Sequence, residues 1–165
     1  VLRNTLFQTS AKRCWRYAHH LLNQGFLTPE PLAYIEERSK GIVWRSWFIN
    51  RYDDNFSCDS YFLHSKSITP AMTNAVSEIV DLLIRLRVCQ LSHGEFEANN
   101  LLMSEPIPTI IDLDSMRFHA NEKKAERMWR FDIKRFMDNW RERYDIYKQF
   151  KQAFSKHGID ISTIF

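Results

Sequence analysis

The stretch HGEFEANNLL, residues 93–102, and the stretch TIIDLD, residues 109–114, decide the fold of this 165-residue chain. Each stretch places acids or amides directly against a short apolar run. We expect a loop, a short strand from Leu101 to Met103, a turn over residues 104–108 and a second strand from Thr109 to Leu113. Such a hairpin would hold the loop close to the end of the second strand.

Oxygen-bearing side chains gather in this predicted hairpin. Asn100 stands where the first strand begins, and Asp112 and Asp114 stand at the end of the second, where the period of two places both on one face. Amide and carboxylate oxygens suit Mg²⁺, a hard cation. Glu95 lies in the loop, where its carboxylate could orient or deprotonate a hydroxyl. The alternative is that the asparagine is a turn residue and the two aspartates are capping residues.

The composition is that of an ordinary soluble globular protein, with 44% hydrophobic and 26% charged residues. The net charge of +3 excludes a nucleic-acid-binding polycation, so we expect no nucleic-acid partner. Cys14, Cys58 and Cys89 are far apart and form no CxxC pair, which argues against a disulfide framework and a zinc site. The apolar runs are far shorter than the roughly 20 residues of a membrane span.

The rest of the chain predicts mostly helix. Thr9 and Ser10 can cap a first helix that ends at Gly25, and Thr69 with Pro70 can begin another. The predicted elements are a helix over 11–24, a hairpin of strands over 32–37 and 42–50 around residues 39–41, a polar connector over 51–60, a helix from 70, and two helices in the aromatic-striped region 121–154. This order of elements predicts an α+β fold.

The spacing of the first stretch matches the catalytic loop of phosphoryl-transfer enzymes, H-x-D-x-x-x-x-N, which is followed by a strand and an Asp. His93 is the first position, Glu95 the third and Asn100 the eighth, and Asp112 takes the place of the metal-binding Asp. In that chemistry a metal neutralises charge on the transferring group while one carboxylate handles the acceptor hydroxyl.

The chain resembles the lipopolysaccharide kinase family, the Kdo/heptose kinase type with a protein-kinase-like fold. Four segments carry the resemblance in the family's order: its C helix running into a strand, its catalytic segment, its metal segment and its C-terminal helix. These segments are residues 10–38, 93–102, 111–117 and 130–140.

The resemblance implies a bilobal kinase. Residues 1–50 would be a remnant of the N-lobe, with the C helix and two strands, and residues 51–165 a mostly helical C-lobe. ATP with Mg²⁺ would be the donor system, and an inner-core sugar of lipopolysaccharide, or a similar small molecule, the acceptor. Glu95 would be catalytic, and His93 would hold the loop. The hinge that meets adenine would include Phe48, Ile49, Asn50 and Arg51, and the metal ligands would be Asn100, Asp112 and Asp114.

The sequence also departs from the family pattern. It has no glycine-rich loop, no strand with an ATP-binding Lys and no Glu in the first helix, and Glu95 replaces the loop Asp. A displacement of about 1 Å can cost on the order of 100-fold in rate. We therefore expect Glu95 to make a slow or inactive variant, and the missing glycine-rich loop and lysine strand predict a fragment of a longer protein. The alternatives are a sugar kinase, a pseudokinase-like binding or stress-response protein, and a small-molecule kinase of the aminoglycoside type.

The expected location follows from the acceptor. The resemblance implies a cytoplasmic bacterial protein with peripheral contact at the inner membrane. The first 29 residues carry Arg3, Lys12, Arg13 and Arg16 and no acid, which suits either a solvated helix face or contact with anionic lipid. A monomer is expected.

Overall fold

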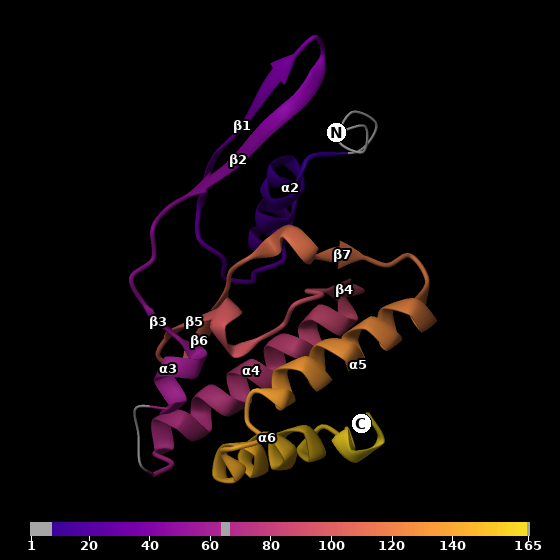
Figure 1. Ribbon diagram of the computed structural model, residues 1–165. Helices are drawn as coiled ribbons and strands as arrows, with labels where there is room; N and C mark the ends of the chain where they lie inside the picture. Colours follow the sequence, from indigo (N-terminus) through magenta and orange to yellow (C-terminus); the bar gives the residue numbers. More distant parts are fainter. Residues whose placement is uncertain (1–7, 64–66, 165) are drawn as a thin grey trace. The chain divides into compact units, whose positions relative to one another are not determined.

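The computed structural model describes residues 8–63 and 67–164, so Arg3 lies outside the described residues. The chain divides into two compact units, one made of Val1–Asp54 and Ile110–Asp114 and the other of Asn55–Thr109 and Ser115–Phe165. We call them unit 1 and unit 2. Helices and small sheets together make a mixed α+β fold (Figure 1), which confirms the predicted class.

Unit 1 begins with helix α2 (Ser10–Asn23). The Thr9 side chain accepts a hydrogen bond from the amide of Lys12, as an N-cap does, and this cap confirms the predicted start. At the other end Gly25 adopts a φ of +74°, and the Phe26 amide donates to the Leu21 carbonyl in a Schellman-type arrangement. The sequence therefore fixes both ends of this helix locally.

Strands β1 (Pro31–Ser39) and β2 (Ile42–Asn50) form the antiparallel hairpin that the sequence predicts. Lys40 and Gly41 make the turn with φ angles of +50° and +80°, which match the type I′ turn favoured by twisted hairpins. Helix α2 packs against both strands, and the Thr9 hydroxyl donates to the Glu36 carboxylate at 2.8 Å (Figure 1). One face of the hairpin is therefore covered by α2.

Unit 2 is built around three long helices, α4 (Pro70–Val88), α5 (Glu122–Asp138) and α6 (Tyr144–Lys156), and α4 contacts both of the others (Figure 1). Thr69 caps α4 by accepting from the amide of Met72, with Pro70 at the first turn, as predicted. The indole of Trp129 donates to the Leu83 carbonyl at 2.7 Å. A cluster of aromatic rings fills the space between the helices: Phe62, Phe96, Phe136, Trp140 and Phe150.

Short strands complete the architecture. Strands β3 (Phe56–Ser57), β5 (Leu101–Ser104) and β6 (Ile107–Ile110) form one sheet in the order β3-β5-β6, and β4 (Leu91–Ser92) pairs with β7 (Arg117–Phe118). The remaining elements are helix α3 (Cys58–Leu63) and the 3₁₀ turns η1 (Ala98–Asn100), η2 (Leu113–Ser115) and η3 (Ile161–Thr163). Sequence reading treated residues 51–60 as a polar connector and missed β3 and the start of α3.

The prediction that the second strand runs to Leu113 is wrong. Strand β6 ends at Ile110, Asp112 adopts a φ of +58°, and η2 follows at once. Asp tolerates this left-handed backbone better than most residues, because its short polar side chain can bond locally. Asp112 and Asp114 therefore do not share a strand face, and Asn100 lies in η1 directly before β5.

None of the helices in residues 8–63 and 67–164 has the length and apolar character that a bilayer span requires.

Candidate active site

The loop from His93 to Asn100 connects β4 to β5 in unit 2. The imidazole of His93 is fully buried, and its ring packs edge-on against Phe96 at a centroid separation of 5.8 Å. The Nδ1 atom of His93 accepts a hydrogen bond from the Glu95 amide at 3.3 Å. The imidazole thus folds the loop back on itself rather than facing solvent.

Asp132 of α5 holds the start of this loop. Its two carboxylate oxygens accept the backbone amides of His93 at 2.8 Å and Gly94 at 2.9 Å. Asp132 is 1% exposed, and its bond to the His93 amide is buried. Sequence reading missed Asp132. The available signal was an acid at helical spacing from Trp129 and Phe136, inside an otherwise apolar stripe.

One further residue of α5 and the residue that caps its C-terminal end also bind the loop. Arg135 donates to the Gly94 carbonyl at 3.2 Å and forms an ion pair with Glu97 at 3.1 Å. The Asn139 side chain accepts the Ala98 amide at 3.3 Å. The backbone of the loop is therefore bonded to one rigid helix at three successive points.

Burial raises the pKa of Asp132 from its ordinary 3.8 to about 6, although the amides of His93 and Gly94 and the nearby Arg135 act in the opposite direction. In the native state Asp132 therefore becomes protonated below about pH 6. In the unfolded state its carboxyl becomes protonated only below about pH 4. Because the native state binds this proton more tightly, the contribution of Asp132 to the free energy of unfolding rises as the pH falls. The rise is about 2 kcal/mol between pH 7.5 and pH 4.5.

Urea denaturation of the wild type and of Asp132→Ala at both pH values measures this contribution. The stability difference between the two proteins is expected to shift in favour of the wild type at pH 4.5. A difference that stays the same at both pH values would show that Asp132 titrates normally.

Position 94 requires glycine because of its backbone conformation and because of the atoms that surround it. Its φ is +85°, and an added Cβ would lie 2.8 Å from the carbonyl oxygen of Ser115. Gly158 in the same unit has a φ of +71° but open space around it. The two glycines separate the cost of the backbone conformation from the cost of the contact.

We expect Gly94→Ala to lower the free energy of unfolding by about 1 kcal/mol more than Gly158→Ala, which should cost only the 1–2 kcal/mol of a left-handed alanine. Thermal and urea denaturation of the two variants measure the difference. Equal losses would mean that the loop moves away from Ser115 without cost.

The side chain of Asn100 is oriented by the loop. Its Nδ2 atom donates to the Glu95 carbonyl at 2.8 Å. The Oδ1 atom is therefore the atom that Asn100 can offer to a cation, which fits the donor chemistry predicted for it. The Glu95 side chain is half-buried.

Unit 1 contains a cavity of about 160 Å³. Asp112 lines it, together with residues from the end of β2, from α2 and from the segment that follows Gly25. The full lining is Cys14, Thr28, Pro29, Phe48, Asn50, Ile111, Asp112 and Leu113. Burial raises the pKa of the Cys14 thiol, and the nearby Asp114 and Asp112 add to the rise. Cys14 therefore contributes a neutral thiol to the cavity wall.

The four predicted hinge residues divide between two environments. Phe48 and Asn50 line the cavity, whereas Ile49 is exposed and lies opposite Ala33 in the hairpin. Arg51 pairs with Glu30 at 2.7 Å on the surface. Alternation along β2 explains the division, because residues 48 and 50 share a face.

Asp114 does not line this cavity. The structure records its backbone carbonyl as an acceptor for the Arg13 guanidinium at 3.0 Å. This bond links the backbone of Asp114 to helix α2 within unit 1.

The helix-supported loop of unit 2 and the helix and hairpin of unit 1 are the parts of a protein-kinase-like fold that the sequence predicted. The chain belongs to the lipopolysaccharide kinase (Kdo/WaaP) family, which matches residues 1–155 and confirms the resemblance inferred from four segments. Among solved structures it is similar to WaaP in complex with acyl carrier protein, with 14% identity and a TM-score of 0.62 over 93% of this chain and 73% of that chain. No curated protein matches the chain.

Proposed function

We propose that the chain is an ATP-dependent phosphotransferase that phosphorylates a sugar hydroxyl of the lipopolysaccharide inner core. Membership of a family of lipopolysaccharide kinases supports kinase activity. The observation that carries the proposal is the loop from His93 to Asn100, whose backbone is bonded at successive points to Asp132, Arg135 and Asn139. Rigid positioning of this kind is the main demand of phosphoryl transfer, in which the protein does little covalent chemistry.

ATP is the donor that the family implies, and we assign part of its binding to the cavity of unit 1. Phe48 offers an aromatic wall, and Asn50 offers a polar side chain. At about 160 Å³ the cavity is smaller than the 300 to 1,000 Å³ usual for ligand pockets, so it would enclose only part of a nucleotide.

For Mg²⁺ we propose Asn100 and Asp112 as ligands, with Asp114 as a third. The amide oxygen of Asn100 and the carboxylate of Asp112 are the hard oxygen donors that this cation prefers. The bound ion would neutralise charge on the phosphates. This part of the proposal is supported by the sequence spacing, by the family and by the orientation of the Asn100 amide.

Glu95 is the residue that we propose to orient the acceptor hydroxyl. The family resemblance places an Asp at this position, one methylene shorter. Glu95→Asp is therefore expected to raise the rate of phosphate transfer on the order of 10- to 100-fold, and Glu95→Gln to reduce it below detection.

The assay follows radiolabelled phosphate from ATP to a Kdo-containing lipopolysaccharide precursor. Glu142→Gln, at an exposed acid of unit 2 outside the loop, is the matched control and should change the rate little. Identical rates for wild type and both Glu95 variants would remove Glu95 from the chemistry. Transfer of phosphate to a small aminoglycoside instead of the lipopolysaccharide precursor would contradict the proposed sugar acceptor.

A second candidate is a pseudokinase-like protein that binds nucleotide without transferring phosphate. Two features favour it: Glu95 in place of Asp, and a helix α2 that carries no acid to pair with a nucleotide-binding lysine. Binding of Mg-ATP without any transfer, in wild type and Glu95→Asp alike, would support this second candidate.

We further propose peripheral contact with the cytoplasmic face of the bacterial inner membrane, where such an acceptor lies. Lys12 and Arg16 on α2 supply the positive charge that anionic lipid attracts. Flotation with liposomes should retain the protein when anionic lipid is present. Equal flotation with neutral liposomes would contradict an electrostatic contact.

A further inference from the structure

The segment from Ile110 to Asp114 enters unit 1 from the end of β6, far along the chain from the helix and hairpin of that unit. Asp112 within it lines the cavity and is the metal ligand proposed above. The backbone of Asp112 is left-handed, with a φ of +58°. Aspartate tolerates this conformation without preferring it, and such residues persist where the surrounding structure holds them. The position of this carboxylate therefore depends on what fixes the backbone on either side.

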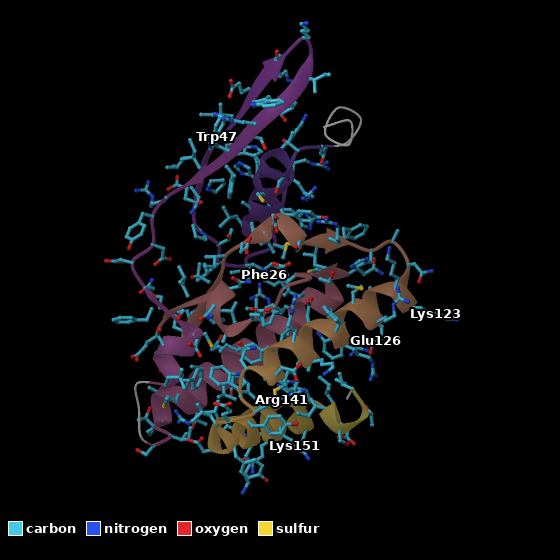
Figure 2. The ribbon with its side chains drawn as sticks, viewed as in Figure 1. Phe26, Trp47, Lys123, Glu126, Arg141 and Lys151 are labelled. Carbon is cyan, nitrogen blue, oxygen red and sulfur yellow. The ribbon has the colours of Figure 1, made fainter. Side chains whose placement is uncertain are left out.

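The backbone before Asp112 is held by the chain that leaves α2. The amide of Ile110 donates to the carbonyl of Leu27 at 2.9 Å. The end of the helix places Leu27 in turn, because the Phe26 amide bonds back to the Leu21 carbonyl and Phe26 is only 2% exposed. Figure 2 labels Phe26 just after α2. Helix α2 thus sets the point at which the segment enters unit 1.

The backbone after Asp112 is held by a side chain of α2 itself. The half-buried Arg13 donates from its Nε atom to the carbonyl of Asp114 at 3.0 Å. Burial is the main cause of the raised pKa of the Cys14 thiol, and the charges of Asp114 and Asp112 add to the rise while the charge of Arg13 opposes it. All three charged groups therefore lie near one sulfur atom. One helix holds the segment on both sides of the proposed ligand.

We propose, on the basis of the function proposed above, that Arg13 is a positioning residue of the metal site. By holding the Asp114 carbonyl, its guanidinium keeps the backbone of Asp112 left-handed and keeps the carboxylate at the cavity wall. A ligand that is fixed before the ion arrives loses less freedom on binding, so the affinity for the metal is higher. Arg13 acts through Asp112 in this role, which differs from the solvated face or lipid contact expected from the sequence.

The charge of Arg13 and its hydrogen bond make opposite contributions to metal binding. A guanidinium beside two carboxylates competes electrostatically with a divalent cation, so the charge alone would weaken the binding of Mg²⁺. The hydrogen bond to the Asp114 carbonyl holds the ligand in place and would strengthen that binding. Loss of the charge and loss of the bond are therefore expected to have different effects.

Two substitutions separate these contributions. Arg13→Gln keeps an N–H donor at the same number of bonds from the backbone as the arginine Nε, but without the charge. Arg13→Met has the same reach and carries neither donor nor charge. Glutamine and methionine are both good helix formers, so α2 should be preserved in both variants. Arg45→Met, at an exposed arginine of β2 in the same unit, is the matched control.

Calorimetric titration with Mg-ATP gives the first readout. Arg13→Met should raise the Kd for Mg-ATP by about tenfold, which is the equilibrium equivalent of one hydrogen bond. Arg13→Gln and Arg45→Met should bind Mg-ATP as tightly as the wild type or more tightly. A merely structural role would instead lower the thermal unfolding midpoint of the nucleotide-free Arg13→Met protein and leave its Kd unchanged.

Hydrogen exchange of the nucleotide-free protein gives the second readout. The amides from Ile111 to Asp114 should exchange faster in Arg13→Met than in Arg13→Gln or Arg45→Met, because only Arg13→Met loses the bond that holds this backbone. Circular dichroism shows whether each variant is folded. This comparison needs neither metal nor nucleotide.

Three outcomes would overturn the role of Arg13 and leave the proposed function intact. They are a Kd for Mg-ATP in Arg13→Met equal to that of the wild type, an equal loss of binding in Arg13→Gln and Arg13→Met, and exchange from Ile111 to Asp114 that no variant accelerates. The second outcome would show that the charge, and not the bond, acts on the metal. A wild type that binds no Mg-ATP would overturn the proposed function, and the role of Arg13 with it.

Discussion

Asp132→Ala is expected to lower the free energy of unfolding by about 3 kcal/mol and to loosen the loop from His93 to Asn100. The change removes the acceptor for the buried amide of His93 and the half-buried amide of Gly94. Each buried amide left without a partner costs about 1–3 kcal/mol, and part of that loss is offset because a buried carboxylate disappears as well. Urea denaturation at pH 7.5 gives the stability, and hydrogen exchange of the loop amides gives the local effect.

Asp138→Ala is the matched control for this prediction. Asp138 lies on the same helix, but its ion pairs with Lys134 and Arg141 lie at the surface. Such pairs contribute about 0–1 kcal/mol, so the variant should unfold almost like the wild type. The account of the loop would be contradicted if the two variants lost the same stability, or if the loop amides exchanged no faster in Asp132→Ala.

Asp112→Asn is expected to remove the stabilisation that Mg-ATP gives to the protein. Asp112 lines the cavity of unit 1 and is the proposed metal ligand, and an amide in its place is a much weaker ligand for Mg²⁺. At a ligand concentration of 100 times Kd, binding stabilises the folded state by about 2.7 kcal/mol, and the variant should lose most of this. Thermal denaturation with and without Mg-ATP measures it.

Glu37→Gln is the control for Asp112→Asn, because it removes one carboxylate from the exposed hairpin of the same unit. It should respond to Mg-ATP like the wild type. An Asp112→Asn protein that keeps the full nucleotide-dependent stabilisation would show that the metal is held elsewhere.

Features decided by a few neighbouring residues could be predicted from the sequence. Thr9 and Thr69 cap their helices as expected, because an N-cap needs only a short side-chain acceptor and the amide three residues later. The hairpin of β1 and β2 also follows from local signals, namely β-branched and aromatic residues around a turn that ends in Gly41. The loop from His93 to Asn100 was predicted because its His, Glu and Asn match the fixed spacing of a kinase catalytic loop.

Features decided by distant residues could not be predicted. Asp132 lies 38 residues after Gly94, and only the folded chain shows that its carboxylate accepts that amide. The end of β6 was misplaced because Ile111 and Leu113 continue an apolar alternation, whereas the positive φ of Asp112 breaks the strand.

Titration of the wild-type chain with ATP, in Mg²⁺ and again in excess EDTA, tests the central claim most directly. Isothermal titration calorimetry should show saturable binding that requires Mg²⁺ and that is lost in Asn100→Ala and in Asp112→Asn. The absence of heat at millimolar nucleotide, or binding of equal strength with and without Mg²⁺, would contradict a metal-dependent kinase site in this chain.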